Sequence, residues 1–394
     1  MPTLLQINFS NFGSTGKIAE QIGTIAINQG WKSIFAYSRG KNESHSEIIR
    51  IGGKMNMYLH GLESRILDNQ GLASRIATKK FIKQIVKISP DIIHLHNIHG
   101  YYLNYKILFE FLKKYNHPIV WTLHDCWPMT GHCCYFTMAD CLKWKTQCYD
   151  CPLKKDYPKS FLFDRSKQNY LDKKRAFTGV KNLHIVSVSN WLNKIVKESF
   201  LDYANLHIIH NGVDISNFKT TIQKKKDFFL ILGVSNVWDQ RKGLFDFYKL
   251  RDLLPEDYHI MLVGLTQKQI RLLPQGITGI TRTANQKELA DLYASADVLV
   301  SLSQCETFGL TIAEAYACGT PAIVYNNTAL PELIPEDNST GYIVHTGDVE
   351  GVASAIKKIK KHPISGEICR NRAKLLYNKD ITFKKYIELY NCIL

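Results

Sequence analysis

Short apolar runs alternate with amphipathic stretches along almost the whole chain. The amphipathic stretches, such as 73–88 and 102–114, carry apolar residues at three- and four-residue spacing, which predicts helices. Several of the short runs are continuously apolar, as strands buried on both faces are. This alternation predicts an α/β protein whose parallel sheets are covered by helices on both faces. The predicted strands are 4–9, 33–37, 92–95, 119–123, 185–188, 207–209, 228–232, 259–263, 298–302 and 322–324.

The pattern restarts in the middle of the chain, which predicts two domains. A polar passage, 215–227, contains three consecutive lysines and is followed directly by a fresh buried strand. One open parallel sheet rarely absorbs so many strands, so we expect two doubly wound domains, 1–214 and 228–375, with 215–227 as the linker. Parallel sheets bind ligands at the carboxyl ends of their strands. Two such domains would place the ligand in the cleft between them.

Composition and charge narrow the function classes. Hydrophobic residues make up 45% of the 394 residues and charged residues 22%, which is typical of a soluble globular protein. No run approaches the roughly 20 apolar residues that span a bilayer, and the first residues lack the basic region of a signal peptide, so we expect a cytoplasmic protein. Residues 1–214 hold 28 Lys and Arg against 16 Asp and Glu, whereas the remainder holds 22 against 19. The basic half indicates nucleic acid, phospholipid headgroups or a phosphorylated substrate as partner, unless lysine is simply enriched throughout.

Two polar segments follow predicted strands of the first half. Gly13 and Gly16 stand between a strand and a helix, where backbone amides and the helix N-terminus favour an anion. The segment lacks the Gly at 11 and the Ser or Thr at 18 that a P-loop requires, and a plain turn is its alternative. His124 and Asp125 come directly after strand 119–123, where they would face a cleft. A lone histidine there also fits a core or capping residue.

The second half carries two cations at the corresponding position. Arg241 and Lys242 follow strand 228–232 and precede a helix. A planar guanidinium and a compact ammonium charge together suit a diphosphate. An exposed basic turn is the alternative interpretation.

Two glutamates eight residues apart form the strongest signal. Glu306 lies in the polar loop after strand 298–302, and Glu314 lies about a turn into the following helix. The N-terminus of that helix stands between them. A carboxylate accepts hydrogen bonds from vicinal hydroxyls while helix amides hold an anion, so the pair suits a polyhydroxylated phosphate ligand.

These residues resemble a known family. Glu306 and Glu314 match the E-x7-E motif of retaining GT-B glycosyltransferases of family 4. The glycine loop 13–16, Asn211-Gly212-Val213-Asp214 and Arg241-Lys242-Gly243 are similar to that family in the expected order, over nearly the whole chain. The stretch Leu-His-Asp-x-Trp-Pro-x-Thr-Gly, followed by cysteines, resembles bacterial polysaccharide transferases of the colanic-acid type. One departure is Asn236, which stands where many family members have an arginine.

The resemblance implies a role for each residue. Glu314 would hold the nucleotide ribose, Glu306 would contact the donor sugar, and His124 would stand beside the reacting sugar carbon. The resemblance also implies GT-B architecture, with two Rossmann-like domains facing a cleft and a C-terminal helix within 376–394 that crosses back to the first domain. The groups expected to bind the donor diphosphate are Arg241, Lys242, Gly13, Gly16 and the amides of Phe308, Gly309 and Leu310.

The resemblance implies a reaction as well. A sugar would move with retained configuration from a nucleotide diphosphate sugar, UDP-linked by family precedent with GDP as alternative, to a glycan or lipid-diphosphate-linked saccharide in bacterial surface polysaccharide biosynthesis. No metal or other cofactor would be required, and the leaving phosphate would accept the acceptor's proton. A GT-B sugar-nucleotide enzyme that hydrolyses its donor, such as an epimerase, is the first alternative. A zinc-containing nucleic-acid-binding protein is more remote because no recognition helix or RNP-type motif appears, and we expect no nucleic-acid partner.

Six of the ten cysteines fall between 126 and 151. Without a secretory signal, such a cluster indicates metal binding more than disulfides. Four of them have a Cys-x-x-Cys arm of structural zinc type, and zinc would hold a Cys-rich insertion, about 126–183, that has little regular apolar pattern. Scattered reduced thiols and redox chemistry at Cys133 and Cys134 are the alternatives. The predicted ligands are Cys133, Cys141, Cys148 and Cys151.

The region 143–197 is strongly basic. It holds 13 basic and 4 acidic residues, with aromatic residues interspersed. This mixture predicts peripheral contact with an anionic membrane surface, and a solvated face is the alternative. A second basic patch on helix 73–88 would comprise Lys79, Lys80, Lys83 and Lys87.

Overall fold

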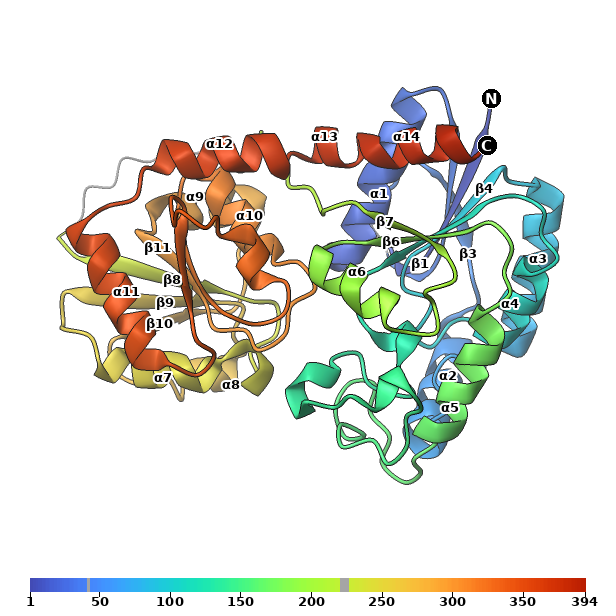
Figure 1. Cartoon of the computed structure of the whole chain (residues 1–394), viewed down its shortest axis with the longest axis horizontal. Coiled ribbons are helices and arrows are strands. Elements are labelled where there is room, and N and C mark those ends of the chain that lie inside the picture. The colour runs from blue at the N-terminus through green and yellow to red at the C-terminus, as the bar shows by residue number, and fades with distance from the viewer. Residues whose placement is uncertain (41–42, 220–226) are drawn as a thin grey trace. The chain divides into compact units, whose positions relative to one another are not determined.

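The computed structural model describes residues 1–40, 43–219 and 227–394, which form two compact units (Figure 1). The first unit comprises Met1–His210 and Phe383–Leu394, and the second comprises Asn211–Thr382. The first unit therefore ends at His210 instead of the expected 214, and it includes only the last part of the expected terminal segment 376–394. Residues 220–226 of the expected linker lie outside the described residues, and the rest of that linker belongs to the second unit.

The first unit is built on a seven-stranded parallel sheet. Its strands lie in the order β3-β2-β1-β4-β5-β6-β7, so the direction of winding reverses between β1 and β4. The strands are β1 (Thr3–Ser10), β2 (Lys32–Arg39), β3 (Glu47–Arg50), β4 (Ile92–Leu95), β5 (Ile119–Leu123), β6 (Leu183–Ser187) and β7 (Asn205–Ile208). The helices are α1 (Gly13–Asn28), α2 (Lys54–Leu67), α3 (Arg75–Ile88), α4 (Tyr105–Leu112), α5 (Ser166–Phe177), α6 (Asn190–Lys197) and α14 (Lys384–Ile393).

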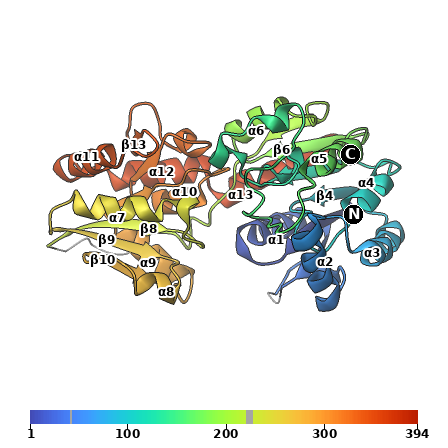
Figure 2. The same cartoon turned by 90° about the horizontal axis from the view of Figure 1, so that it is seen from below.

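The second unit repeats the plan with a six-stranded sheet (Figure 2). The strand order is β10-β9-β8-β11-β12-β13, and winding reverses between β8 and β11. The strands are β8 (Phe229–Val234), β9 (Tyr258–Val263), β10 (Ile277–Ile280), β11 (Val298–Ser301), β12 (Ala322–Tyr325) and β13 (Gly341–Val344). The helices are α7 (Leu244–Asp252), α8 (Gln267–Ile270), α9 (Gln286–Ser295), α10 (Leu310–Ala317), α11 (Val349–Lys361), α12 (Gly366–Leu376) and α13 (Lys379–Thr382). The predicted α/β class with two doubly wound, Rossmann-like domains is confirmed.

The C-terminal helix α14 completes the core of the first unit. Tyr386 and Tyr390 are fully buried, and α14 lies beside α1 (Figure 1). The Tyr390 ring contacts that of Trp31 at a centroid distance of 5.5 Å, and its hydroxyl is 2.6 Å from Nδ1 of His94 in β4. The helix is therefore part of the first unit through both packing and hydrogen bonding.

The expected cysteine-rich insertion leaves the sheet after β5 and returns at β6. It contains three short 3₁₀ helices before α5: η1 (Trp127–Met129), η2 (Phe136–Ala139) and η3 (Lys143–Lys145). The buried side chain of Lys173 in α5 stabilises the first part of this insertion. Its ammonium donates to the carbonyls of Trp127 (2.7 Å) and Thr130 (3.0 Å) and lies 3.6 Å from the centroid of the Trp127 ring. Burial lowers the pKa of Lys173 to about 7.

Candidate functional site

The loop after β1 brings the main chain close to the start of α1. Gly13 has φ +72°, which favours glycine. A Cβ atom at Gly16 would lie 2.7 Å from the carbonyl carbon of Asn11 and 2.8 Å from the oxygen of Ser10, so a side chain there would displace the loop. Phe12 provides no side-chain cap for α1. The amides of the first helical turn therefore have no side-chain acceptor from Phe12, which is the arrangement by which a helix N-terminus can bind an anion.

A hydrogen-bonded chain of side chains runs beneath the carboxyl ends of β1, β4 and β5. Nε2 of His124 is 3.1 Å from Nδ1 of His96, and Nε2 of His96 is 3.1 Å from Oε1 of Gln6. The Gln6 amide nitrogen donates to the carbonyl of Ala19 at 2.8 Å. The fixed carbonyl of Ala19 thereby orients the Gln6 amide, with its oxygen toward His96.

This series of hydrogen bonds determines which ring nitrogen of each histidine carries the proton. Because the Gln6 oxygen only accepts, His96 carries its proton on Nε2, and its Nδ1 accepts from Nε2–H of His124. Both rings are neutral at neutral pH: burial lowers the pKa of His124 to about 4 and that of His96 well below its ordinary value. Nδ1 of His124 therefore bears the lone pair.

Replacing Gln6 by methionine is expected to remove this control of the tautomer. With selectively ¹⁵N-labelled histidine, the wild-type His124 ring should give the spectrum of a single Nε2–H tautomer. The Gln6→Met variant should give a mixture, because His96 then has no acceptor that selects its Nε2–H form. Gln29→Met at the end of α1 is the control. An Nδ1–H form of His124 in the wild type would contradict the assignment.

The loop carrying His124 is fixed by its neighbour, Asp125. One carboxylate oxygen of Asp125 is 2.8 Å from Nε2 of His99, and the other accepts from the amide of Trp127 at 2.9 Å. Burial alone would raise the pKa of Asp125, but the adjacent His99 and the hydrogen bonds hold it below its ordinary value. Nδ1 of His99 is 3.4 Å from the Tyr157 hydroxyl. The pair thus joins the loop after β5 to the loop after β4 and to the insertion.

In the second unit, the loop after β8 meets the loop after β11. Lys242 forms an ion pair with Glu306, and both side chains are mostly buried. Arg241 donates from its guanidinium to the carbonyl of Cys305 at 3.4 Å, and its own carbonyl accepts from the amide of Gln304 at 2.8 Å. A Cβ atom at Gly243 would lie 2.3 Å from the Leu302 carbonyl oxygen, so glycine is required for the loops to meet.

The helix α10 carries Glu314 away from this pair. Gly309 precedes the helix at φ +101° and provides no side-chain cap. Phe308 is buried and contacts the ring of Tyr377 at 5.7 Å. One carboxylate oxygen of Glu314 accepts from the hydroxyl of Tyr293, a fully buried residue of α9, at 2.8 Å. The helix start at Leu310 therefore stands between two carboxylates whose positions are both fixed by partners.

The predicted residues form one group in each unit. Gly13, Gly16 and His124 lie at the carboxyl end of the first sheet. The second-unit residues, from Arg241 to Glu314, lie in the segments that follow β8 and β11, on either side of the switch point. Sequence reasoning missed His96 and Gln6. His96 directly follows strand 92–95, and the positional argument used for His124 would have found it.

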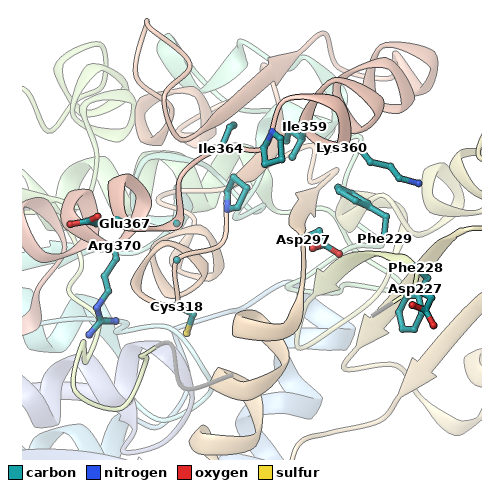
Figure 3. A pocket seen from close by; sticks show the side chains of 14 residues that line it. Asp227, Phe228, Phe229, Asp297, Cys318, Ile359, Lys360, Ile364, Glu367 and Arg370 are labelled. Atoms are coloured by element: carbon teal, nitrogen blue, oxygen red, sulfur yellow. The ribbon is translucent and has the colours of Figure 1, made fainter. Parts of the chain in front are cut away.

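The second unit also has a cavity of about 780 Å³, shown in Figure 3. Its labelled side chains include Phe229, Asp297 and Cys318. Phe229 opens β8, and Asp297 directly precedes β11. The cavity thus lies at the amino ends of the strands, away from Arg241 and Glu306, and none of the predicted donor-binding residues lines it.

The four predicted zinc ligands line one small cavity in the insertion. Cys133 and Cys151 share a hydrogen bond, and the amides of Gly131 and Leu153 donate to the sulfurs of Cys148 and Cys151. No three of the four sulfurs lie within 4.8 Å of one another. Among the described residues, His99, Asp125 and Cys134 do bring three possible metal-ligand atoms within 4.8 Å of one another. His132 also lines the cavity, and its buried Nε2 has no hydrogen-bond partner within the described part of the chain.

Comparisons with known proteins agree with this architecture. The family model "Glycosyltransferase Family 4" matches residues 28–217, and "Glycosyl transferases group 1" matches residues 213–376. The chain is 24% identical over 410 aligned residues to the putative colanic acid biosynthesis glycosyl transferase WcaC of Escherichia coli, covering 96% of each protein.

Two solved structures show the same fold over the whole chain. The sucrose-phosphate synthase of Thermosynechococcus elongatus superposes with a TM-score of 0.74 at 17% identity, covering 99% of this chain and 98% of that one. Anabaena Alr3699/HepE in complex with UDP and glucose gives 0.69 at 15% identity, covering all of both chains. The chain belongs to the GT-B glycosyltransferases, with a family 4 first domain and a group 1 second domain.

Proposed function

We propose that this enzyme transfers a sugar from a UDP-sugar to a saccharide acceptor, with retained configuration, in the biosynthesis of a bacterial surface polysaccharide. The observation that carries the proposal is the second-unit group, in which Lys242, Glu306 and the uncapped start of α10 adjoin one another and Glu314 follows. The relation to WcaC supports the pathway. The UDP complex of HepE supports the nucleotide.

The second unit would bind the donor and stabilise its leaving group. Arg241 and Lys242 bring two positive charges to the diphosphate, and the amides of α10 add oriented dipoles. These groups oppose the negative charge that grows on the diphosphate oxygen as the bond to the sugar carbon breaks. Glu314, fixed by Tyr293, would accept from the ribose hydroxyls, and Glu306 would contact the sugar.

The first unit would hold the acceptor and the reacting sugar. The acceptor hydroxyl oxygen forms the new bond to the anomeric carbon on the face that the diphosphate leaves. Its proton passes to the departing diphosphate oxygen, so no protein nucleophile or cofactor enters the balance. Neutral His124 would stand beside that carbon, held in one tautomer by His96 and Gln6.

The donor site is tested by thermal unfolding with UDP, GDP and their sugars. Saturating UDP should raise the Tm of the wild type, because a ligand at 100 times its Kd stabilises the folded state by about 2.7 kcal/mol. In Glu314→Ala the shift should disappear. Glu314→Gln retains an acceptor for Tyr293 but loses the charge, and it should also bind UDP weakly.

Glu256→Ala, an exposed glutamate before β9, is the matched control and should respond to UDP like the wild type. No Tm shift with any nucleotide would overturn the proposal. Release of UDP from a UDP-sugar at the same rate with and without saccharide acceptors would instead favour a hydrolysing sugar-nucleotide enzyme.

We also propose a structural zinc ion in the insertion. The residues fit such an ion: four thiols surround one cavity, and backbone amides already donate to two of the sulfurs. Four thiolates are a typical closed set for structural zinc, although the sulfurs must draw closer together to bind it. Zinc would link Cys133, which follows Asp125 by eight residues, to Cys148 and Cys151, which come later in the sequence.

A further inference from the structure

Three side chains of the types that bind metal ions meet beyond the carboxyl ends of β4 and β5. His99 lies in the loop after β4, Asp125 lies in the loop after β5, and Cys134 lies in the insertion. A nitrogen, an oxygen and a sulfur of these side chains lie within 4.8 Å of one another, and in the described part of the chain no other such group of His, Cys, Asp or Glu does. All three side chains are buried in the first unit. Three different donors from separate segments therefore share one buried space.

The histidine and the aspartate are each held by a contact on their other side. One carboxylate oxygen of Asp125 is 2.8 Å from Nε2 of His99, and the other accepts from the amide of Trp127 at 2.9 Å. Nδ1 of His99 faces the hydroxyl of Tyr157 at 3.4 Å, and the ring lies 5.1 Å from that of Trp127, between centroids. Outer contacts of this kind hold metal ligands in place. The inner atoms, Nε2 and a carboxylate oxygen, are thus already directed toward each other.

The thiol of Cys134 distinguishes this group from an ordinary ion pair. A histidine and a carboxylate satisfy one another by hydrogen bonding and need no third donor. The carbonyl of Cys134 accepts from the amide of Cys126 at 3.1 Å, which holds the thiol's segment against the residue that follows Asp125. Cys134 does not line the cavity of the four insertion cysteines. Its thiol therefore belongs with His99 and Asp125 and is separate from the proposed insertion zinc.

One divalent cation would balance the charge of the three ligands. Ionised Asp125 and a Cys134 thiolate carry one negative charge each, and histidine binds metals in its neutral form. A buried set with no net charge avoids the cost of uncompensated buried charge. On binding, the thiol proton of Cys134 passes to solvent. The proton on Nε2 of His99 is replaced by one on Nδ1, which the Tyr157 hydroxyl accepts, and the Nε2 lone pair binds the ion.

The donor types and their spacing favour zinc. Imidazole nitrogen, carboxylate oxygen and thiolate sulfur are ordinary zinc ligands with bonds of about 2.0–2.3 Å, which separate the ligand atoms of a tetrahedral ion by about 3.3–3.8 Å. The present separations need only small adjustments, the largest known one being an opening of the 2.8 Å His99–Asp125 contact by roughly 0.5 Å. Magnesium and calcium prefer sets of oxygen ligands, which a thiolate does not supply.

We propose that His99, Asp125 and Cys134 bind a zinc ion, with water in the fourth position. This site goes beyond the proposed transferase function and does not rest on it. Binding replaces the hydrogen bond between His99 and Asp125 and uses three protein ligands, so it is weaker than a closed four-ligand site. The purified chain therefore takes up this ion when metal is added. The bound ion joins the insertion to the loops after β4 and β5, directly beside His124.

The test is titration of the purified full chain with Co²⁺, followed by absorption spectroscopy. Tetrahedral Co²⁺ with a thiolate ligand gives visible bands and a sulfur-to-metal charge-transfer band in the near ultraviolet. The wild type should bind one equivalent more than Cys134→Ser, with both kinds of band, and Zn²⁺ should displace it. A wild type without a saturable charge-transfer band would overturn the proposal. So would a band equally strong in Cys134→Ser, because the cobalt would then be bound at other cysteines.

Further variants separate the ligands from their surroundings. His99→Gln should weaken Co²⁺ binding by about tenfold or more, since even an outer partner of a metal ligand contributes about tenfold to affinity. Cys126→Ser is the matched control, because Cys126 is also a buried cysteine beside Asp125, and it should change Kd less than twofold. Far-ultraviolet circular dichroism verifies that each variant is folded. Equal weakening by Cys126→Ser would show a general effect on the loop and overturn the assigned ligands.

Nuclear magnetic resonance of ¹⁵N-labelled histidine identifies the binding nitrogen. Added Zn²⁺ should convert Nε2 of His99 from a protonated to a metal-bound signal, with the resonance assigned by its loss in His99→Gln. His124 should keep its Nε2–H form, because its partners His96 and Gln6 are outside the site. A zinc-dependent change at His124 with none at His99 would overturn the assignment. These readouts need no nucleotide, so their failure leaves the proposed transferase function intact.

Discussion

Replacing Lys242 by alanine is expected to lower kcat by a factor of about 100 to 1000, because removing one preorganised group that stabilises a developing charge typically costs that much. Lys242 stands next to Arg241 and contacts Glu306. In the transition state its ammonium would face the leaving diphosphate. The diphosphate oxygen that bridges to the sugar then carries more negative charge than it does in the bound donor. KM for the UDP-sugar should rise less than kcat falls. Steady-state rates with a UDP-sugar and a saccharide acceptor measure both.

Lys249→Ala is the matched control for this variant. Lys249 also pairs with a carboxylate, that of Asp246 at 3.2 Å, but it is exposed on α7. Both variants leave one acidic side chain without its lysine, so a general effect of unpairing would appear in both. Lys242→Arg keeps the charge and should recover part of the rate. A kcat within threefold of the wild type for Lys242→Ala would contradict the assigned role.

Metal analysis of the purified chain is expected to find about one zinc ion per molecule, and Cys148→Ser with Cys151→Ser should abolish it. Loss of a structural metal is among the few changes that destabilise a domain by more than about 4 kcal/mol. For a domain of this size, each kcal/mol shifts Tm by about 2–4 °C. Tm of the first unit should therefore fall by about 10 °C or more, and a strong chelator should lower it similarly in the wild type.

Cys392→Ser is the control for the zinc prediction, because Cys392 is exposed on α14 far along the sequence from the insertion. It should retain the metal and the wild-type Tm. UDP binding should persist in the double variant, because Arg241, Lys242 and Glu314, the main groups proposed to bind the nucleotide, belong to the other unit. Purified protein without zinc, iron or another bound metal would contradict a metal site at these cysteines.

The sequence predicted the central strands well and the edge strands poorly. β4 and β5 have the predicted limits because both are mostly apolar and fully buried. β3 lies at the sheet edge, and none of its four residues is buried. β10 and β13 are also at sheet edges and are short and only partly buried. An edge strand buries one side or less, so the apolar run that marks a strand is missing.

The sequence alone predicted those site residues that lie close together in one segment of the chain. Glu306 and Glu314 stand in a single strand–loop–helix motif, so their spacing is visible in the sequence. The residues that hold His124 in one tautomer, His96 and Gln6, cannot be recognised by spacing in the sequence. Gln6 is paired in register with His94, which brings it within reach of His96, and that register is set by the assembled sheet.

The assignment of α14 to the first unit has a consequence for the order of events during synthesis. Trp31 and His94 of the first unit are synthesised before the whole second unit, yet their partners Tyr386 and Tyr390 are synthesised only after it. The second unit, Asn211–Thr382, is continuous and needs no later residue. Of the two units, the one that starts first is therefore finished second, and its incomplete core must be kept from misassociation while the second unit is synthesised.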